Sequence, residues 1–149
     1  MTTQDLSREI ILDHYQSPRN HGRLDNPTVA NRGHNPLCGD EIELSVDIDA
    51  EEERIRDIAF TGRGCSISQA SASMMTEAVK GKDKAAIGTL FEKVHNLLTQ
   101  QDAPAGAELG KLAALSGVRE FPSRVKCASL CWHTLNAALD RSASTVSTE

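Results

Sequence analysis

The strict alternation of apolar and polar residues at positions 41–48 constrains the fold more than any other feature of this sequence. The apolar set is Ile42, Leu44, Val46 and Ile48, and the polar set is Glu41, Glu43, Ser45 and Asp47. Successive side chains of a strand point to opposite faces, so this period predicts a strand with one face in water. Residues 54–61 follow a polar turn and place Ile58 and Phe60 on one face. The two segments therefore predict an antiparallel hairpin.

Apolar residues at helical spacing predict helices on both sides of this hairpin, over residues 5–16, 66–80, 84–100, 107–116 and 123–140. Ser17-Pro18 ends the first helix, since the residue before a proline disfavours helical geometry. The second begins in a Ser-x-x-Gln capping box at Ser66 and ends at Gly81. Asp83 and Ser123 are predicted to cap the third and the last helix, and Gly117 to end the short one between them.

Two segments carry no such pattern. Residues 18–39 contain proline or glycine at six positions among polar residues, which predicts turns and loops. Residues 141–149 are rich in serine and threonine and contain one larger apolar residue, Val146, which predicts a disordered tail. A chain of 149 residues is long enough to bury a core without disulfides. We therefore expect one domain over residues 1–140.

Composition argues against several classes of protein. The 16 Lys and Arg residues against 21 Asp and Glu give a net charge of -5, which disfavours nucleic acid as a partner. No apolar run approaches the roughly 20 residues that cross a bilayer. The first residues lack the basic start and apolar run of a signal peptide. We therefore expect a cytoplasmic protein with no membrane partner, in which thiols stay reduced.

Four cysteines in a cytosolic chain of this size suggest metal or sulfur chemistry before disulfides. Cys38 and Asp40 lie just before the first predicted strand, Cys65 lies at the junction of the hairpin and the next helix, and Cys127 lies early in the last helix. Zinc takes thiolate and carboxylate ligands, so these four side chains form a chemically sufficient set. The N-H groups of the helix after Cys65 also favour a thiolate there. Scattered cysteines are, however, most often small buried hydrophobic residues. Their spacing alone therefore does not decide between a metal site and core packing.

The remaining candidate ligands are predicted to be structural. Cys131 follows Cys127 by one helical turn, among Leu130, Trp132 and Leu135, and is expected in the core. The histidines are expected at the surface or at helix caps, since a lone histidine is more often that than a ligand. They are His14, His21, His34, His95 and His133.

Four segments, in order along the chain, carry a resemblance to a known family. They are residues 14–22 (HYQSPRNHG), 35–40 (NPLCGD), 62–75 (GRGCSISQASASMM) and 124–127 (RVKC). Together they resemble the U-type iron-sulfur assembly family, and most closely its SufU branch. Scaffold members of the IscU type carry histidine immediately before the third cysteine, where this chain has Lys126. The SufU branch also carries a longer segment before that cysteine, and residues 81–122 are long enough to hold it.

The resemblance implies an α+β fold, in which a small antiparallel sheet is packed with helices, and a zinc ion held by Cys38, Asp40, Cys65 and Cys127. It implies a zinc-dependent sulfurtransferase that accepts sulfane sulfur from the persulfide of a SufS-type cysteine desulfurase and passes it toward a SufBCD-like assembly complex. Cys38 corresponds to the sulfur acceptor, which leaves zinc when a histidine of the desulfurase takes its place. Arg124 is similar to the arginine that engages the desulfurase.

Two other functions remain open from the sequence. One is a scaffold on which an iron-sulfur cluster is built, and the other is a structural zinc domain without chemistry. Lys126 argues against the scaffold, because a protonated amine cannot bind a metal. The position of Cys38 among glycine and proline residues argues against a purely structural ligand, which gains nothing from a flexible loop.

Overall fold

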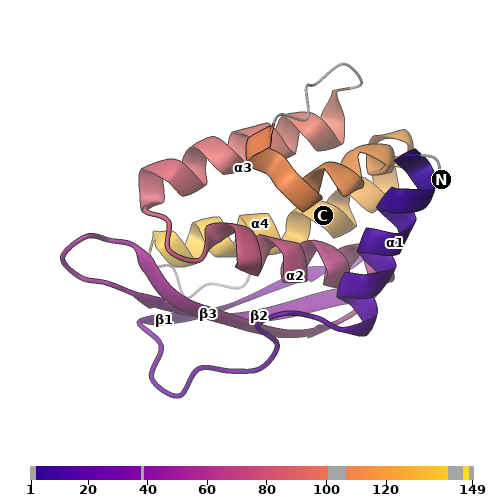
Figure 1. Ribbon diagram of the computed structural model, residues 1–149. Helices are drawn as coiled ribbons and strands as arrows, with labels where there is room; N and C mark the ends of the chain where they lie inside the picture. Colours follow the sequence, from indigo (N-terminus) through magenta and orange to yellow (C-terminus); the bar gives the residue numbers. More distant parts are fainter. Residues whose placement is uncertain (1–2, 38, 101–106, 141–145, 148–149) are drawn as a thin grey trace.

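A computed structural model describes residues 3–37, 39–100, 107–140 and 146–147, and Figure 1 shows how its helices and strands are arranged. In chain order the elements are α1 (Thr3–Gln16), β1 (Val29–Asn35), β2 (Asp40–Ile48), β3 (Ile55–Arg63), α2 (Ser66–Val79), α3 (Lys84–Thr99), η1 (Ala107–Glu120), α4 (Pro122–Leu139) and β4 (Val146–Ser147). The predicted hairpin and the helices around it are confirmed. The fold is a single α+β domain.

The sheet has the strand order β3-β2-β1-β4. Strands β2 and β3 form the predicted antiparallel hairpin, with Leu44 opposite Phe60. Strand β1 pairs antiparallel with β2, whereas β4 pairs parallel with β1, where Val146 lies opposite Gly33. Strands β1, β2 and β3 thus form the expected antiparallel sheet, and the short β4 adds a parallel neighbour at one edge, so the four-stranded sheet is mixed.

Strand β1 corrects the prediction of loop over residues 18–39. Its residues alternate between buried and exposed as a strand should, but the buried positions hold Asn31, Gly33 and Asn35 rather than apolar residues. A prediction based on hydrophobicity therefore could not detect this strand. The buried amide of Asn31 is paired, because its Nδ2 donates to the carbonyl oxygen of Thr134 at 3.3 Å.

The helices cover one face of the sheet, and Figure 1 shows them together above the strands. Helices α2 and α4 lie against the sheet, α1 packs beside α2, and α3 and η1 pack on the outer side of α4. The largest fully buried side chains include Phe60 and Leu44 on the sheet and Trp132 on α4, and the last of these stacks edge-on against Phe91 of α3, so the core extends from the sheet through the helices.

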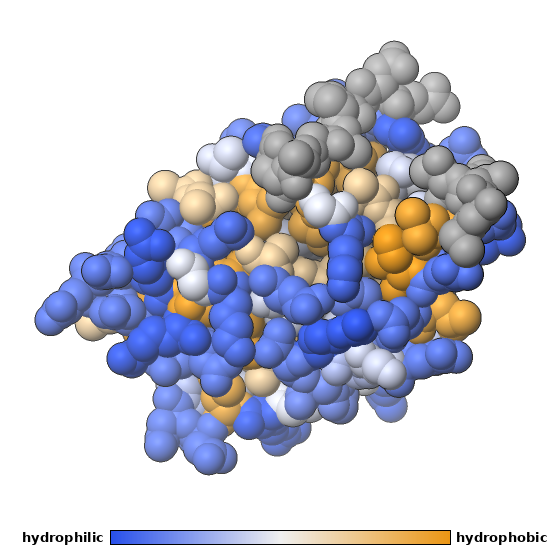
Figure 2. All heavy atoms as spheres, in the orientation of Figure 1, coloured by the Kyte–Doolittle hydropathy of each residue, from blue (hydrophilic) through white to orange (hydrophobic). Residues whose placement is uncertain are grey.

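The uncovered face of the sheet carries charged side chains, as the alternation in β2 predicts. Arg63 pairs with Glu41 at 3.0 Å and Arg32 pairs with Glu43 at 3.4 Å. In the view of Figure 2, hydrophilic residues cover most of the surface and hydrophobic ones form smaller groups between them. That distribution is ordinary for a folded domain, whose surface always retains some apolar atoms.

The helix starts differ in part from the predicted ones. Asp83 caps α3 as expected, accepting from the N-H of Ala86 at 2.8 Å. Helix α2, however, is capped by Cys65 rather than by Ser66. Helix α4 is not capped by Ser123, because Pro122 occupies its first turn after the N-cap residue Phe121. Proline suits that position, since its fixed φ is already helical and its missing N-H would have no helical partner.

The connection before α4 also differs from its prediction. The segment η1 is a 3-10 helix that continues through Gly117 to Glu120 and is interrupted by non-helical geometry at Gly110. In the C-terminal segment, Val146 and Ser147 form β4. The predicted disorder stays a prediction for residues 141–145 and 148–149, which lie outside the described residues. Among the helices that the structure describes, none combines the length and the apolar character needed to cross a bilayer.

Candidate metal centre

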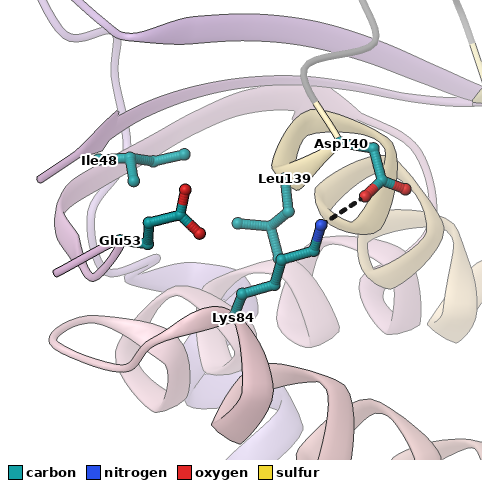
Figure 3. Close-up of a pocket in the computed structure, with 5 residues that line it drawn as sticks. All are labelled: Ile48, Glu53, Lys84, Leu139 and Asp140. Atoms are coloured by element: carbon teal, nitrogen blue, oxygen red, sulfur yellow. Dashed lines mark hydrogen bonds and ion pairs between the residues drawn. The ribbon is translucent and has the colours of Figure 1, made fainter. Parts of the chain in front are cut away.

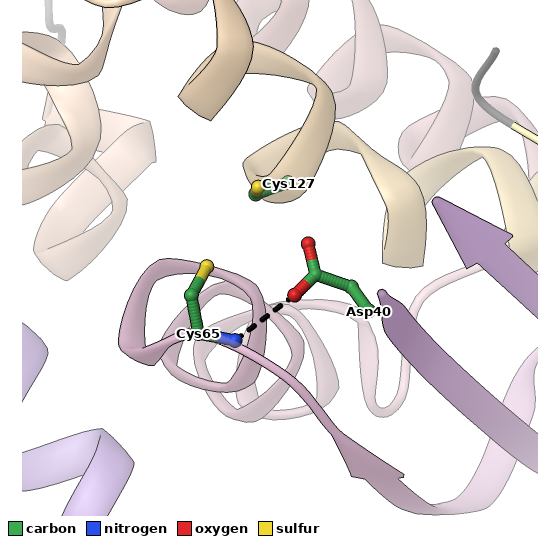
Figure 4. Close-up of side chains that lie close together, drawn as sticks. All are labelled: Asp40, Cys65 and Cys127. Atoms are coloured by element: carbon green, nitrogen blue, oxygen red, sulfur yellow. Dashed lines mark hydrogen bonds between the residues drawn. The ribbon is translucent and has the colours of Figure 1, made fainter. Parts of the chain in front are cut away.

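Three potential ligands converge where three elements begin. Asp40 is the first residue of β2, Cys65 is the N-cap of α2, and Cys127 lies in the second turn of α4. Their ligand atoms all lie within 4.8 Å of one another, and Figure 4 shows the three side chains directed into one space. Three of the four ligands expected from the sequence are thus brought together by the fold.

The Asp40 carboxylate is held in a buried position by backbone and side-chain donors. Asp40 has no exposed surface, and its Oδ1 accepts from the N-H of Cys65 at 2.9 Å. Its Oδ2 accepts from Nδ2 of Asn35 at 3.4 Å. A Cβ atom added at Gly64 would overlap the Asp40 carboxylate, so the close approach of these two segments requires glycine there.

The two sulfur atoms have different surroundings. Cys65 is half-buried, and its Sγ accepts from the N-H of Ser68 at 3.4 Å in the first turn of α2. Cys127 is fully buried, and its Sγ lies 3.6 Å from Nδ2 of Asn35. Each sulfur thus has one N-H donor beside it, and the Sγ of Cys127 also donates to the carbonyl oxygen of Ser123 at 3.5 Å.

The donor set fits zinc. In tetrahedral zinc sites the thiolate and carboxylate donor atoms lie about 3.6–3.8 Å apart, as bond lengths of about 2.0–2.3 Å require. The spacing of up to 4.8 Å here therefore needs only a small contraction. None of the ion pairs among the described residues involves Asp40. A buried carboxylate without a cationic partner is costly, and a bound metal ion would supply that partner.

The fourth expected ligand, Cys38, lies outside the described residues, and its role stays a prediction. The residues on either side of it are described. Leu37 is 63% exposed, and Gly39 adopts a φ of +73° in the turn that leads into Asp40. Position 38 therefore precedes Asp40, a ligand of the centre, by two residues in the sequence.

Arg124 and Lys126 lie on α4 close to Cys127. Arg124 is exposed in the first turn of the helix, three residues before Cys127, and Lys126 is half-buried directly before it. The proposed contact of Arg124 with a desulfurase stays a prediction. Its exposure at the start of α4 leaves it accessible from outside.

Cys131 is a core residue, as predicted. Its side chain is 2% exposed, and burial raises the pKa of its thiol to about 12, although its contact with Ser71 opposes the shift. The Sγ lies 3.4 Å from Oγ of Ser71 and donates to the carbonyl oxygen of Ala128 at 3.7 Å. It is therefore a protonated packing residue that lies apart from the three ligands.

The prediction for His14 as a surface or capping residue was wrong. His14 is completely buried between α1 and α2, and its Nδ1 lies 2.7 Å from Oγ of Ser73. The spacing from Ile10 and Ile11 could have revealed it, since position 14 continues the apolar stripe of α1. His21 and His95 are exposed, as expected, and His34 and His133 are half-buried.

A hollow near the C-terminal end of α4 is shown in Figure 3. It has a volume of about 270 Å³ and is lined by Ile48, Glu53, Lys84, Leu139 and Asp140. The Nζ of Lys84 is already paired with Asp140 at 2.9 Å. Twelve residues of helix separate Leu139 from Cys127, which corresponds to about 18 Å along the axis. This hollow is therefore distinct from the metal centre.

Comparison with known proteins gives concordant matches. The family model of the NifU-like N terminal domain matches residues 6–128. The iron-sulfur cluster assembly scaffold protein IscU of Streptococcus pyogenes serotype M1 is 45% identical over 138 residues, which cover 93% of this chain and 85% of that protein. The zinc-dependent sulfurtransferase SufU of Bacillus subtilis (strain 168) is 42% identical over 130 residues, covering 87% and 86%.

A solved structure supports the same relation. A candidate iron-sulfur cluster assembly scaffold protein of the SUF system from Fervidobacterium islandicum AW-1 superposes with a TM-score of 0.81 at 34% sequence identity. The match covers 88% of this chain and 94% of the other. This solved structure thus shares the fold over most of both chains, and the two sequence relatives carry names from two functional branches.

Proposed function

The chain belongs to the family of the NifU-like N terminal domain, and we propose that it acts in iron-sulfur cluster assembly as a zinc-dependent sulfurtransferase. The observation that carries the proposal is the donor set: a carboxylate and two sulfurs within 4.8 Å, with lysine rather than histidine beside Cys127. This set suits zinc, which binds mixed sulfur and oxygen ligands without redox chemistry.

In this proposal Asp40, Cys65 and Cys127 hold the metal, and Cys38 is both the fourth ligand and the sulfur acceptor. Zinc, when bound, supplies the positive charge that keeps the ligand thiols deprotonated. Asp40 lies on β2, Cys127 lies on α4 and Cys65 is the N-cap of α2, and each of the three takes part in hydrogen bonds. In the sequence Cys38 falls between β1 and β2, two residues before Asp40, and it is the one member of the donor set to which we also assign the reacting sulfur.

The transfer step is a thiol-persulfide exchange. The Cys38 thiolate attacks the outer sulfur of the desulfurase persulfide, a new S-S bond forms at Cys38, and the S-S bond in the desulfurase breaks. The desulfurase cysteine leaves as a thiolate, so the negative charge is conserved and no external oxidant is needed. The persulfide on Cys38 then passes its outer sulfur by the same exchange to a downstream assembly complex.

Arg124 is the residue we assign to recognition of the desulfurase. It is exposed at the start of α4, three residues before Cys127, where a partner approaching the centre would meet it. The planar guanidinium binds carboxylates in a bidentate manner, which suits a contact that orients two proteins.

The alternative function is that of a cluster scaffold, which the name of the Streptococcus pyogenes relative favours. The two functions differ in the metal that the purified protein carries. Under the proposed function, anaerobic purification without chelator gives about one zinc per chain. Iron with the visible absorbance of a cluster, and little zinc, would support the scaffold instead.

The proposal is tested by comparing Cys38→Ser and Asp40→Ala with the parent protein in desulfurase turnover. Cys38→Ser removes the acceptor atom and is expected to abolish stimulation even where zinc remains. Asp40→Ala is expected to weaken zinc retention and raise the reactivity of the released thiolates. Zinc content and mass analysis of persulfide on each cysteine provide the readouts. A Cys38→Ser protein that accelerates the desulfurase at the parent rate would remove Cys38 as the acceptor.

A further inference from the structure

Asn35, the last residue of β1, connects the metal centre to the turn that contains Cys38. We propose that Asn35 is a positioning residue, which holds Asp40 and Cys127 at ligand spacing and closes the base of that turn. The inference rests on the proposed function for the role of Cys38. Its effect on metal binding depends only on the three described ligands.

The side chain of Asn35 is completely buried and uses both ends of its amide. Its Nδ2 donates to Oδ2 of Asp40 at 3.4 Å and to Sγ of Cys127 at 3.6 Å. Its Oδ1 accepts from the N-H of Leu37 at 3.2 Å. One amide group therefore contacts two ligands on different elements and the backbone of the turn.

The orientation of the amide follows from its neighbours. Reversing it would turn Oδ1 toward the Asp40 carboxylate and the Cys127 sulfur, and Nδ2 toward the Leu37 N-H, which is itself a donor. The contacts with the Asp40 carboxylate and with the Leu37 N-H would then be repulsive. The amide nitrogen thus lies within hydrogen-bond distance of one ligand atom on β2 and one on α4.

Asn35 also binds the residues on both sides of Cys38. Its side chain binds the N-H of Leu37, and its main-chain oxygen accepts from the N-H of Gly39 at 2.9 Å. The residues immediately before and after Cys38 are therefore both bonded to Asn35. The same residue fixes the base of the turn and two ligands, so it couples the position of the acceptor segment to the metal centre.

The structural alternative is that Asn35 is simply a satisfied buried amide. Asn31 provides the matched comparison, because it lies four residues earlier on the same face of β1 and is 2% exposed. Its Nδ2 donates to the oxygen of Thr134 and its Oδ1 accepts from the N-H of Arg32. Asn31 thus has the same chemistry and burial but bonds none of the three ligands.

The experiment compares Asn35→Ala, Asn35→Ser and the control Asn31→Ala in the full chain. Serine retains an oxygen that can accept from an N-H two residues later, as in ST-turns, but it lacks the two amide hydrogens. Asn35→Ser therefore separates closure of the turn from donation to the ligands. Zinc affinity is measured by competition with a chromophoric chelator, and site geometry by the thiolate-to-metal and d-d absorption bands after cobalt substitution.

Both Asn35 variants are expected to lose about 10–100-fold in zinc affinity, the usual effect of removing a partner of a metal ligand. They should also shift the cobalt bands, whereas Asn31→Ala should leave affinity and bands at the parent values. Thermal unfolding of the metal-free proteins shows whether each variant is folded.

Zinc affinity and cobalt bands in Asn35→Ser that match those of Asn31→Ala would overturn the positioning role. These measurements need no desulfurase. A parent protein that fails to carry persulfide on Cys38 would therefore remove the sulfurtransferase proposal without touching the assignment of Asn35.

Discussion

Replacing Gly64 by alanine gives a direct test of how tightly the metal centre is assembled. Gly64 adopts a φ of +145°, a conformation that residues with a Cβ rarely adopt. An added Cβ would lie 2.9 Å from Cγ of Asp40 and 3.0 Å from its Cα, and would overlap Oδ1. The substitution therefore combines backbone strain with displacement of a ligand.

Gly22→Ala serves as the matched control. Gly22 has a similar φ of +136°, but a Cβ there would meet no atom within 4 Å. It therefore measures backbone strain alone, which costs about 1–3 kcal/mol. Gly64→Ala adds the loss of the bond from the Cys65 N-H to the Asp40 carboxylate, worth about 1.5–3 kcal/mol for a charged acceptor. The total of about 3–6 kcal/mol leaves most domains of this size folded.

A domain of about 150 residues loses about 3 °C in Tm per kcal/mol. Metal-free Gly64→Ala is therefore expected to melt about 5–9 °C below Gly22→Ala in circular dichroism, and to retain less zinc per chain after purification. Equal melting temperatures and equal zinc content in the two variants would refute the claim that Asp40 is held against Gly64.

Two further predictions concern buried groups. Cys131→Ala is expected to keep its zinc and lose about 1 kcal/mol of stability. In the parent protein, burial raises the pKa of the Cys131 thiol to about 12, so this thiol should resist alkylation until the protein is unfolded. Mass analysis of peptides after alkylation checks this expectation. Burial lowers the pKa of His14, and Arg19 adds to this effect while Glu77 opposes it. The unfolded chain then binds the extra proton below about pH 6.5, so stability present above that pH is lost as the pH falls. His14→Gln should reduce this loss in metal-free protein, and denaturant titrations with the same pH dependence in both proteins would contradict the assignment.

The sequence allowed prediction of those parts of the fold in which apolar residues carry the pattern. The hairpin and the helices were predictable because their buried faces are made of aliphatic side chains. Strand β1 was not, because its buried positions hold two asparagines and a glycine, which carry no apolar pattern. His14 was missed for a related reason, since an imidazole in an apolar stripe is counted as polar although it is buried.

The residues of the candidate site could be predicted where the residue type itself is a typical metal ligand. Asp40, Cys65 and Cys127 could be grouped because thiols and carboxylates are potential ligands wherever the fold places them. Asn35 gave no such signal, because an amide is not a typical zinc ligand and its role depends on contacts across the fold. The cap at Cys65 was hidden by the adjacent Ser66, a better capping residue by type.

The separation of the ligands along the chain bears on when the centre can form during biosynthesis. The bond from Cys65 to Asp40 spans 25 residues, and the contact between Asn35 and Cys127 spans 92. The ribosome synthesises the chain from its N-terminus, so Cys38, Asp40 and Cys65 are all made well before Cys127 of α4. Until α4 docks on the sheet, Cys127 is therefore missing from the donor set proposed above. The complete centre can therefore form only after the last helix of the domain has joined the sheet.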